Sequence, residues 1–514
     1  MTMKKYIYIS TLFMGLSLVS CKKDFLETSP TDRVAAPTLF ETADGAQVAM
    51  DGIYRMLYSS GWATGNNGQN FGIMSTKLYT SLMGEDMVQD AQGNGWFYFD
   101  YRYDVRSRYT LTTWRPYATW NFYYSLVSNA NYILAEDGKI PGDKAVIDNI
   151  MAQAYAMRAY AYFQLIQSFQ QTYIGHQTSP GVPLYTEPTT SAAEGKGRGT
   201  VEDVYTQINA DINKAIELFA AKGKQSHKSH VDYYVAQAIK ANVALVQNKW
   251  TEAAAAATEA LSKSGLAMIS GDDLYSGFNS TKLKNVMWGA EIIADQSTIY
   301  SSFFSHMDAS ADRYAKSSRK CIYSWLYGMI PAADARKKWW NGATDGGTNV
   351  TKPYNQVKFR YSDVAADLGD YVFMRAEEMQ LVKAEALCHA ERYAEAKDAL
   401  AALWKLRNPT GYQATLDQAT LSKELTMGST GSPVTLMDHI ILQRRIELWG
   451  EAERIFDVLR LKTGFNRNVT GSNHSSKPTW NTLEAASKEF ILTIPQKEFD
   501  GNPNMNATTD QNPL

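Results

Sequence analysis

The sequence predicts a mostly α-helical protein in which paired helices form a repeat scaffold and irregular excursions project from it. Two observations support this fold class. An internal repeat places small and aromatic residues at helical spacing, and two long stretches lose that periodicity while aromatic residues accumulate. A hydrophobic fraction of 45% and a charged fraction of 20% over 514 residues are also typical of a globular protein with a large core.

The internal repeat occupies two helical hairpins, near residues 231–263 and 371–407. The matched positions are Ala241, Ala244, Trp250, Ala253, Ala257 and Ala260 in the first hairpin and Ala384, Leu387, Tyr393, Ala396, Leu400 and Leu403 in the second. Small side chains let the paired helices approach closely and an aromatic residue fills the bend, which is the pattern of a tetratricopeptide hairpin. The alternative is a pair of unrelated alanine-rich hairpins.

Apolar periodicity predicts further helices along the chain. Their approximate ranges are Thr38–Tyr58, Ile73–Met83, Trp114–Ala135 and Lys144–Gln171. Another helix begins at Thr200, where Thr200 and Asp203 form a start signal.

The stretch Val434–Gly464 reads as one long charged helix near the C-terminus. Thr435 and Asp438 form a start signal of the capping-box type, and Gly464 is a stop signal. The ionic stripe on one face consists of Arg444, Glu447, Glu451 and Arg454. Because a buried charge needs a partner of opposite sign, we interpret this stripe as structural rather than catalytic.

Two segments without helical periodicity lie near residues 61–115 and 271–370. Irregular segments held by a rigid scaffold commonly carry function, and we expect these two to meet on one face. Tyr and Trp rings offer a flat apolar face to the C–H groups of a sugar and a polar edge to its hydroxyls. The ligand-binding candidates, chosen for surroundings rich in Gly, Asn or Ser, are Trp96, Tyr98, Tyr101, Trp288, Tyr300 and Trp325.

Residues 1–20 read as an export signal, with a basic start and the apolar run Tyr6–Val19. This run is shorter than the roughly 20 residues that a membrane span needs. Leu18-Val19-Ser20-Cys21 resembles a bacterial lipobox, in which Cys21 becomes the lipid-bearing first residue of the mature protein. An ordinary signal with an incidental cysteine is the alternative. Residues 21–37 then form a tether, and residues 38–514 a single domain.

Several functions find no support in the residues. A net charge of −2 gives no indication of nucleic-acid binding. The seven histidines have no metal-ligand spacing, and no phosphate loop, nucleophile elbow or cysteine cluster occurs, so neither a metal nor a cofactor is predicted. Cys321 and Cys388 are interpreted as buried thiols. Glu85-Asp86 is an acidic pair, which leaves a secreted all-α glycoside hydrolase as an enzyme alternative.

Four motifs occur in the order found in a known family. They are C-x-x-D-F-L-E at Cys21–Glu27, A-x-x-x-R-A-x-x-Y-F at Ala154–Phe163, R-R-x-E-L-x-x-E-x-x-R-x-x-D at Arg444–Asp457, and I-P-x-x-E with N-P-N and Q-N-P at Ile494–Pro513. With these motifs the sequence resembles the SusD/RagB family, the outer-membrane nutrient-binding lipoproteins of Bacteroidetes. The motifs touch both ends and the middle of the chain, whereas the excursions match none of them.

The resemblance implies a SusD-like fold and a protein held on the outer face of the outer membrane by the lipid on Cys21. It also implies a non-catalytic function, in which an oligosaccharide is captured and delivered to a partner TonB-dependent β-barrel transporter of the SusC type. Oligopeptide capture is the close alternative, because the RagB branch is associated with peptides. A repeat scaffold that binds only proteins is a third possibility. For the ligand site, the resemblance carries over regions and no individual residues.

Overall fold

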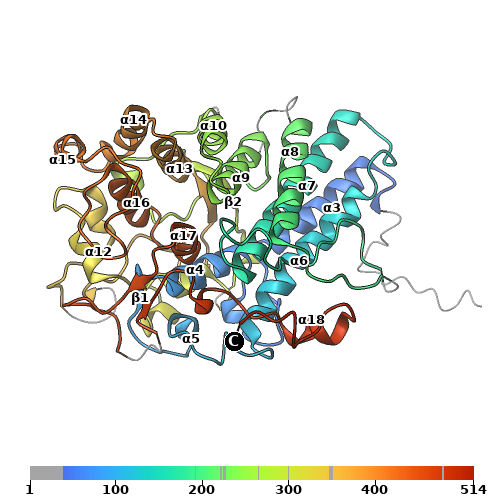
Figure 1. The fold of residues 1–514 in the computed structure, drawn as a ribbon, viewed down its shortest axis with the longest axis horizontal. Coiled ribbons are helices and arrows are strands. Elements are labelled where there is room, and N and C mark those ends of the chain that lie inside the picture. Colours follow the sequence, from blue (N-terminus) through green and yellow to red (C-terminus); the bar gives the residue numbers. More distant parts are fainter. Residues whose placement is uncertain are drawn as a thin grey trace, which may run out of the picture.

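The structure, a computed structural model, describes residues 39–513 except 191–192, 220–222, 224–226, 264, 299, 347–350 and 477–479. The expected export signal, Cys21 and the tether lie outside these residues. The described chain is mostly helical, with three two-stranded sheets between its helices (Figure 1). None of its described helices is both long and apolar enough to cross a membrane.

A row of antiparallel helices forms the scaffold. In chain order these are α3 (Ala43–Met56), α6 (Trp114–Leu134), α7 (Lys144–Phe169), α8 (Val201–Phe219), α9 (Tyr233–Val246), α10 (Trp250–Leu261), α13 (Ala376–His389) and α14 (Tyr393–Trp404). From α6 onward each helix packs against the next in this order, so that α10 joins the first repeat hairpin to the second (Figure 1). The predicted tetratricopeptide-like helical scaffold is confirmed.

The two repeat hairpins share the conformation of their bends. Asn248 and Glu391 occupy matching positions and both adopt left-handed backbone angles, with φ of 58° and 60°. Two residues later the aromatic residue of each repeat begins the second helix. The ring of Trp250 stacks on His389 of the second hairpin with centroids 4.0 Å apart, which ties the units together.

The long helix predicted over Val434–Gly464 is in fact two helices, α16 (Leu436–Glu447) and α17 (Arg454–Leu461). Its predicted start is confirmed, because Thr435 caps α16 and forms a capping box with Asp438. The prediction of one continuous helix is wrong because the helical spacing of its apolar residues, from Ile441 to Leu459, continues across the break.

The break between α16 and α17 has a local cause. Gly450 adopts φ of +78°, and a Cβ at this position would lie 2.7 Å from the ring of Phe359. Backbone carbonyls released from the helix at Glu447 and Trp449 each accept a hydrogen bond of 3.0 Å from Nζ of Lys358. The buried lysine therefore replaces helical hydrogen bonds that the break removes.

The excursions contain short elements around one buried helix, α4 (Ile73–Met83), whose residues are all buried. Strand β1 (Met87–Gln89) pairs antiparallel with β3 (Lys320–Ile322), which joins the two excursions directly. Strand β2 (Val286–Ala290) pairs with β4 (Tyr371–Arg375), and β5 (Phe465–Asn466) with β6 (Thr482–Leu483). The remaining short helices are α5 (Tyr98–Tyr101), α11 (Phe303–Met307), α12 (Ser324–Gly328), α15 (Tyr412–Gln418) and α18 (Gln496–Gly501).

A buried ionic network connects α16 to the second excursion and the second hairpin. Glu447 has no exposed surface and contacts Arg336, Arg375 and Arg407 at 3.1, 2.8 and 2.9 Å. Burial would raise the pKa of Glu447, but Arg407, Arg375 and Arg336 outweigh it and hold that pKa well below its usual value. Glu451 pairs with Arg375 at 2.6 Å. The charges of this stripe therefore have the structural role that we predicted.

The acidic pair at the end of α4 belongs to a second buried network. Arg445 binds Asp86 and Arg454 binds Glu85, the latter at 2.6 Å. Both carboxylates are buried, with exposed fractions of 0% for Glu85 and 4% for Asp86. They lie away from solvent and already accept charged hydrogen bonds, so they serve to hold α4 against the break before α17.

Candidate functional site

The structure buries three of the six ligand-binding candidates. Trp288 lies on β2 with no exposed surface, between the rings of Tyr160 and Phe373 at 5.4 and 5.0 Å. Its neighbour Gly289 suggested an exposed loop, but a Cβ at Gly289 would lie 2.4 Å from the carbonyl oxygen of Tyr371 on the paired strand. The glycine is needed for close strand pairing, and the expected exposure of Trp288 is wrong.

Tyr98 and Tyr101 are also buried, with exposed fractions of 4% and 0%. The hydroxyl of Tyr101 lies 3.0 Å from Nδ1 of His474, and the guanidinium of Arg467 lies 5.0 Å above the Tyr101 ring. The one-turn helix α5 thus turns these rings inward against the C-terminal segment. The expectation that they are exposed is wrong as well, because their polar surroundings form bonds inside the protein.

Trp96 and Tyr300 come together around a third ring, that of Tyr314. The centroid of Tyr314 lies 5.8 Å from Trp96 and 5.9 Å from Tyr300. Tyr300 is 63% exposed, and the other two rings are half-buried. We call Trp96, Tyr300 and Tyr314 the aromatic platform. Because Trp96 comes from the first excursion and the two tyrosines from the second, both segments meet on one surface, as predicted.

The aromatic platform has a rigid base. A Cβ on Gly68 would lie 3.6 Å from the Trp96 ring, so this ring rests on the backbone of the first excursion. The hydroxyl of Ser301, next to Tyr300, donates a 2.8 Å hydrogen bond to the carbonyl oxygen of Asn67. Below Tyr314, the ring of His306 is stacked at 4.9 Å and contacts the carbonyl oxygen of Gly68. Residues of both excursions that form the platform therefore rest on one short turn, Asn67-Gly68.

His306 is uncharged in this setting. Complete burial, followed by the nearby charges of Lys320 and Arg115, lowers the pKa of His306 well below its ordinary value. An uncharged ring can stack on Tyr314 without the desolvation cost of a cation. The base of the platform is therefore buried and uncharged at His306, while Asn67 and Asn94, which lie near Gly68 and Trp96 in the sequence, are exposed.

Trp325 occupies a different environment. It lies on α12, is half-buried, and packs against the guanidinium of Arg445 at 4.9 Å and the ring of Tyr323 at 6.3 Å. No ring contact joins it to the platform within the described residues. Tyr314, which belongs to the platform, was not among the six candidates predicted from the sequence. Its polar neighbours Asp312 and Lys316 were a signal of exposure that could have identified it.

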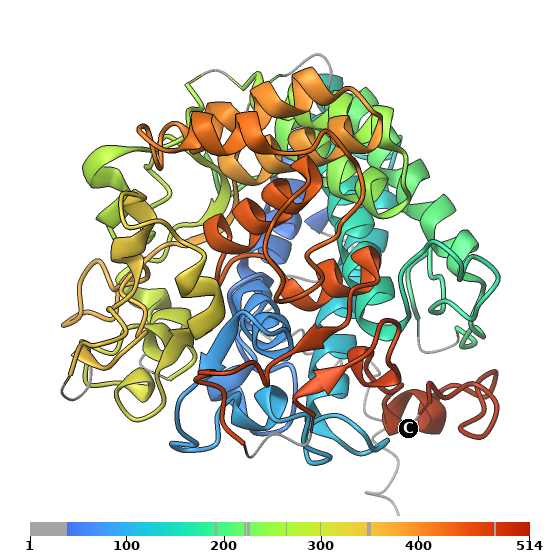
Figure 2. The same cartoon turned by 60° about the vertical axis from the view of Figure 1, so that its left-hand side comes forward.

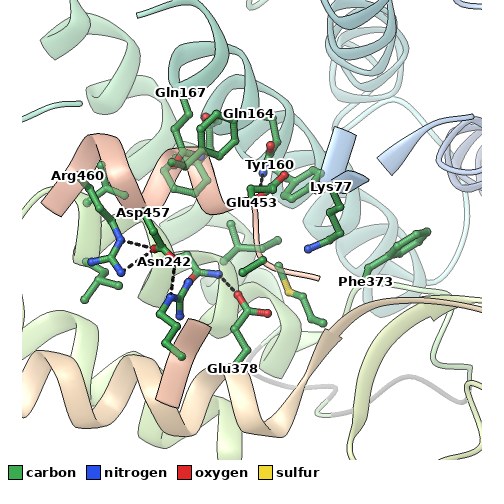
Figure 3. A pocket seen from close by; sticks show the side chains of 18 residues that line it. Lys77, Tyr160, Gln164, Gln167, Asn242, Phe373, Glu378, Glu453, Asp457 and Arg460 are labelled. Atoms are coloured by element: carbon green, nitrogen blue, oxygen red, sulfur yellow. Dashed lines mark hydrogen bonds and ion pairs between the residues drawn. The ribbon is translucent and has the colours of Figure 1, made fainter. Parts of the chain in front are cut away.

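A small, partly open cavity lies between helices of the scaffold rather than at the platform (Figure 3). Its volume is about 60 Å³, and polar groups such as Lys77, Asn242, Glu378 and Glu453 line it together with Tyr160. This volume holds a few water molecules and is too small for an oligosaccharide. In the described ranges, no His, Cys, Asp and Glu residues are grouped to hold a metal ion.

Comparisons with known proteins agree with this architecture. A SusD-like family model described as starch-binding and associating with the outer membrane matches residues 61–245, and the model of the SusD family matches residues 298–514. The chain belongs to the SusD/RagB family. SusD-like protein P2 of Formosa agariphila is 23% identical over 98% of this chain and 99% of its own length.

Solved structures show the same fold. A SusD-like carbohydrate-binding protein from Bacteroides vulgatus has a TM-score of 0.77 at 24% identity, covering 91% of this chain and 98% of that one. A laminarin-binding SusD-like protein has a TM-score of 0.64 at 20% identity, covering 92% and 100%. Surface glycan-binding protein A from Bacteroides uniformis has a TM-score of 0.65 at 17% identity, covering 92% and 99%. The fold is therefore SusD-like.

Proposed function

We propose that this SusD/RagB-family protein captures an oligosaccharide at the cell surface and delivers it, chemically unchanged, to a partner TonB-dependent β-barrel transporter. The observation that carries the proposal is the aromatic platform, where Trp96, Tyr300 and Tyr314 from two distant segments gather on a rigid base. The names of structural relatives support the ligand class, because they include a laminarin-binding protein and a surface glycan-binding protein.

The platform suits binding without chemistry. A pyranose ring stacks its C–H face on an exposed aromatic ring, and exposed amides nearby accept or donate hydrogen bonds to its hydroxyls. The acidic pair Glu85-Asp86 is buried and engaged by Arg445 and Arg454. Stacking on a few open rings gives moderate affinity, which allows the ligand to leave for a transporter.

Calorimetry with single variants tests this proposal. Neutral oligosaccharides and oligopeptides are titrated into the wild type, and the class that binds is then used with Tyr300→Ala. Loss of one stacking ring costs about 1–3 kcal/mol by analogy with base stacking, a weakening of roughly tenfold to a hundredfold. Trp480, which is 40% exposed and outside the platform, provides the matched control Trp480→Ala.

Each result of this experiment has a distinct meaning. Binding of oligosaccharides that Tyr300→Ala weakens and Trp480→Ala does not is the expected result. Binding of oligopeptides alone assigns the platform to peptides. New reducing ends in the oligosaccharide after incubation would show catalysis and overturn the non-catalytic proposal.

The surface location rests on Cys21, which lies outside the described residues. We propose that this cysteine carries the lipid that holds the protein on the outer face of the outer membrane, which accords with the family description. Replacing it, as in Cys21→Ala, should block lipid attachment and release the protein from the membrane fraction. If the variant remains in the membrane fraction after a high-salt wash, the lipid-anchor proposal is wrong.

A further inference from the structure

A groove outside the platform runs between α6, the segment around Tyr185, and α18. It consists of two adjoining cavities of about 380 and 290 Å³, both bordered by Tyr117, Pro495 and Lys497. Figure 1 shows α18 beside the lower end of α6. Volumes of this size are typical of sites for small organic ligands. None of the three platform rings borders this groove.

The wall of the groove on α6 is a stripe of aromatic and small polar residues. Tyr117, Trp120 and Tyr124 recur at three- and four-residue spacing, which places them on one face of the helix. Asn121 and Ser125 lie beside them on the same face. One helical turn rises by about 5.4 Å, so that successive rings are spaced on the scale of single sugar units. This face alternates rings with hydroxyl and amide groups, which suits both the C–H faces and the hydroxyls of a sugar chain.

The opposite wall is fixed and carries both signs of charge. Glu498 accepts a 3.1 Å hydrogen bond from Nε1 of Trp120 and a 2.7 Å hydrogen bond from the amide of Asn502. Lys497 places its ammonium 4.2 Å from the centroid of the Tyr117 ring. Adjacent opposite charges favour a neutral ligand over an ion. The long side chain of Lys497 covers a ring face that a ligand could occupy once the lysine moves aside.

The groove begins close to the aromatic platform. Ala63 and Thr64 border the smaller cavity, and Gly68, four residues further on, lies under the Trp96 ring. Because the chain spans at most about 3.6 Å per residue, Thr64 and Gly68 lie within about 14 Å of each other. Figure 2 shows the first excursion, in blue, between the second excursion, in yellow, and the C-terminal segment, in dark red.

We propose that this groove is an extension of the ligand site, which binds the continuation of a long neutral oligosaccharide whose other part stacks on the aromatic platform. The inference rests on the proposed function, because it assigns a preferred chain length to the same ligand. Short chains contact the platform alone. Long chains also stack on Tyr117, whereas Tyr124 packs against Trp120 and Tyr185 and shapes the wall. They hydrogen-bond to the hydroxyl and amide groups of this face.

The test is calorimetry with two chain lengths of one neutral oligosaccharide series, the shortest that binds the wild type and one several times longer. Tyr117 is half-buried and its described contact is with Lys497, so Tyr117→Ala should fold normally. This variant should weaken the long chain by about tenfold and leave the short chain unchanged. Tyr300→Ala should weaken both. Tyr412→Ala, at a half-buried tyrosine on α15 that borders neither site, is the control and should change neither.

The outcomes separate this inference from the proposed function. If Tyr117→Ala leaves the long chain unchanged while Tyr300→Ala weakens both chains, the groove proposal is overturned and the platform proposal stands. If no neutral oligosaccharide of any length binds the wild type, the proposed function itself fails. Lys497→Ala tests whether the ammonium itself holds the ligand: unchanged or tighter binding of the long chain is expected, and loss of that binding would overturn stacking on the ring that Lys497 covers.

Discussion

The repeat hairpins and the two excursions reach a stable structure by different means. In the hairpins, buried alanines such as Ala253 and Ala384 let regular helices pack closely, and each bend repeats the same backbone conformation. In the excursions, regular structure is limited to a few residues at a time. Their segments are held instead by buried charges and by hydrogen bonds from side chains to backbone atoms, such as those of Lys358.

The difference separates the residues that stabilise the protein from those available for binding. Buried charges can hold irregular chain in place only where every charge has a partner, so these residues are not free to contact a ligand. Exposed rings such as Tyr300 contribute little to the core and remain available. Variants of the buried charges should therefore lower stability without changing affinity, and variants of the exposed rings should lower affinity without changing stability.

The largest effect is expected for Glu447→Ala, which removes the shared partner of Arg336, Arg375 and Arg407. The three buried guanidinium groups keep Asp334, Glu377 and Glu451 but lose one carboxylate, which should lower the free energy of unfolding by about 3–5 kcal/mol. Chemical denaturation measures this loss, and Glu395→Ala, which breaks the exposed pair with Arg392, is the control that should unfold as the wild type does. Unchanged stability with abolished ligand binding would place Glu447 in the site and contradict the structural role.

Trp288→Ala tests the comparison further. Trp288 and Tyr300 have similar flanking residues in the sequence, but Trp288 is buried and Tyr300 is exposed. Removing a fully buried tryptophan should lower the free energy of unfolding by about 3–5 kcal/mol through the cavity it leaves. The affinity of folded Trp288→Ala protein for the platform ligand should stay unchanged. Tyr300→Ala should instead weaken ligand binding and leave the free energy of unfolding unchanged. A Trp288→Ala protein that unfolds normally but binds poorly would show that the buried ring supports the site.

Periodicity was sufficient to predict the scaffold from the sequence. The start and end of Ile73–Met83 agree with α4, and the starts at Trp114 and Lys144 agree with α6 and α7. The break at Gly450 was not predictable in this way, because it depends on the ring of Phe359 and the lysine at 358, which are distant in the sequence.

Exposure of aromatic residues was harder to predict. The flanking residues of Tyr300 indicated exposure correctly, those of Trp96 belong to a half-buried ring, and those of Trp288 reflected close strand pairing. Tyr314 was missed because its importance arises from contacts with two rings that lie far apart in the chain. Glycine-rich surroundings thus mark unusual backbone, which is common both at exposed loops and at tight internal contacts.

A smaller effect is expected from acid, which should destabilise the protein through His306 in the second excursion and His474 in the C-terminal segment. Burial, together with Lys320 and Arg115, lowers the pKa of His306, and burial with Arg467 lowers that of His474. Below about pH 6.5 these histidines gain protons when unfolded but not when folded, so stability should fall as the pH falls through that value. Each contributes at most about 1.4 kcal/mol per pH unit.

Urea denaturation between pH 7.5 and 5 in steps of roughly half a unit would follow this loss. His306→Phe keeps a ring against Tyr314 but cannot be protonated, so its stability should depend less steeply on pH than that of the wild type. His227 is exposed, and His227→Gln should keep the wild-type dependence. Identical slopes for His306→Phe and the wild type would exclude His306 as a source of the acid sensitivity.

The smallest effect is expected from Glu453, which borders the small cavity in Figure 3. Its Oε1 atom is buried without a hydrogen-bond partner among the described residues, and Oε2 lies 3.5 Å from the amide nitrogen of Gln164. Burial raises the pKa of Glu453 although Lys77 and Gln164 act in the opposite direction. A raised carboxyl pKa means that ionisation disfavours the folded state, so this cost is absent in acid and develops as the pH rises through the ordinary pKa of glutamate.

Glu453→Gln keeps the shape without the charge and should raise the free energy of unfolding by about 1 kcal/mol at pH 7, with no gain near pH 4. A destabilised Glu453→Gln protein at pH 7 would show instead that the ionised carboxylate is needed there as the partner of Lys77.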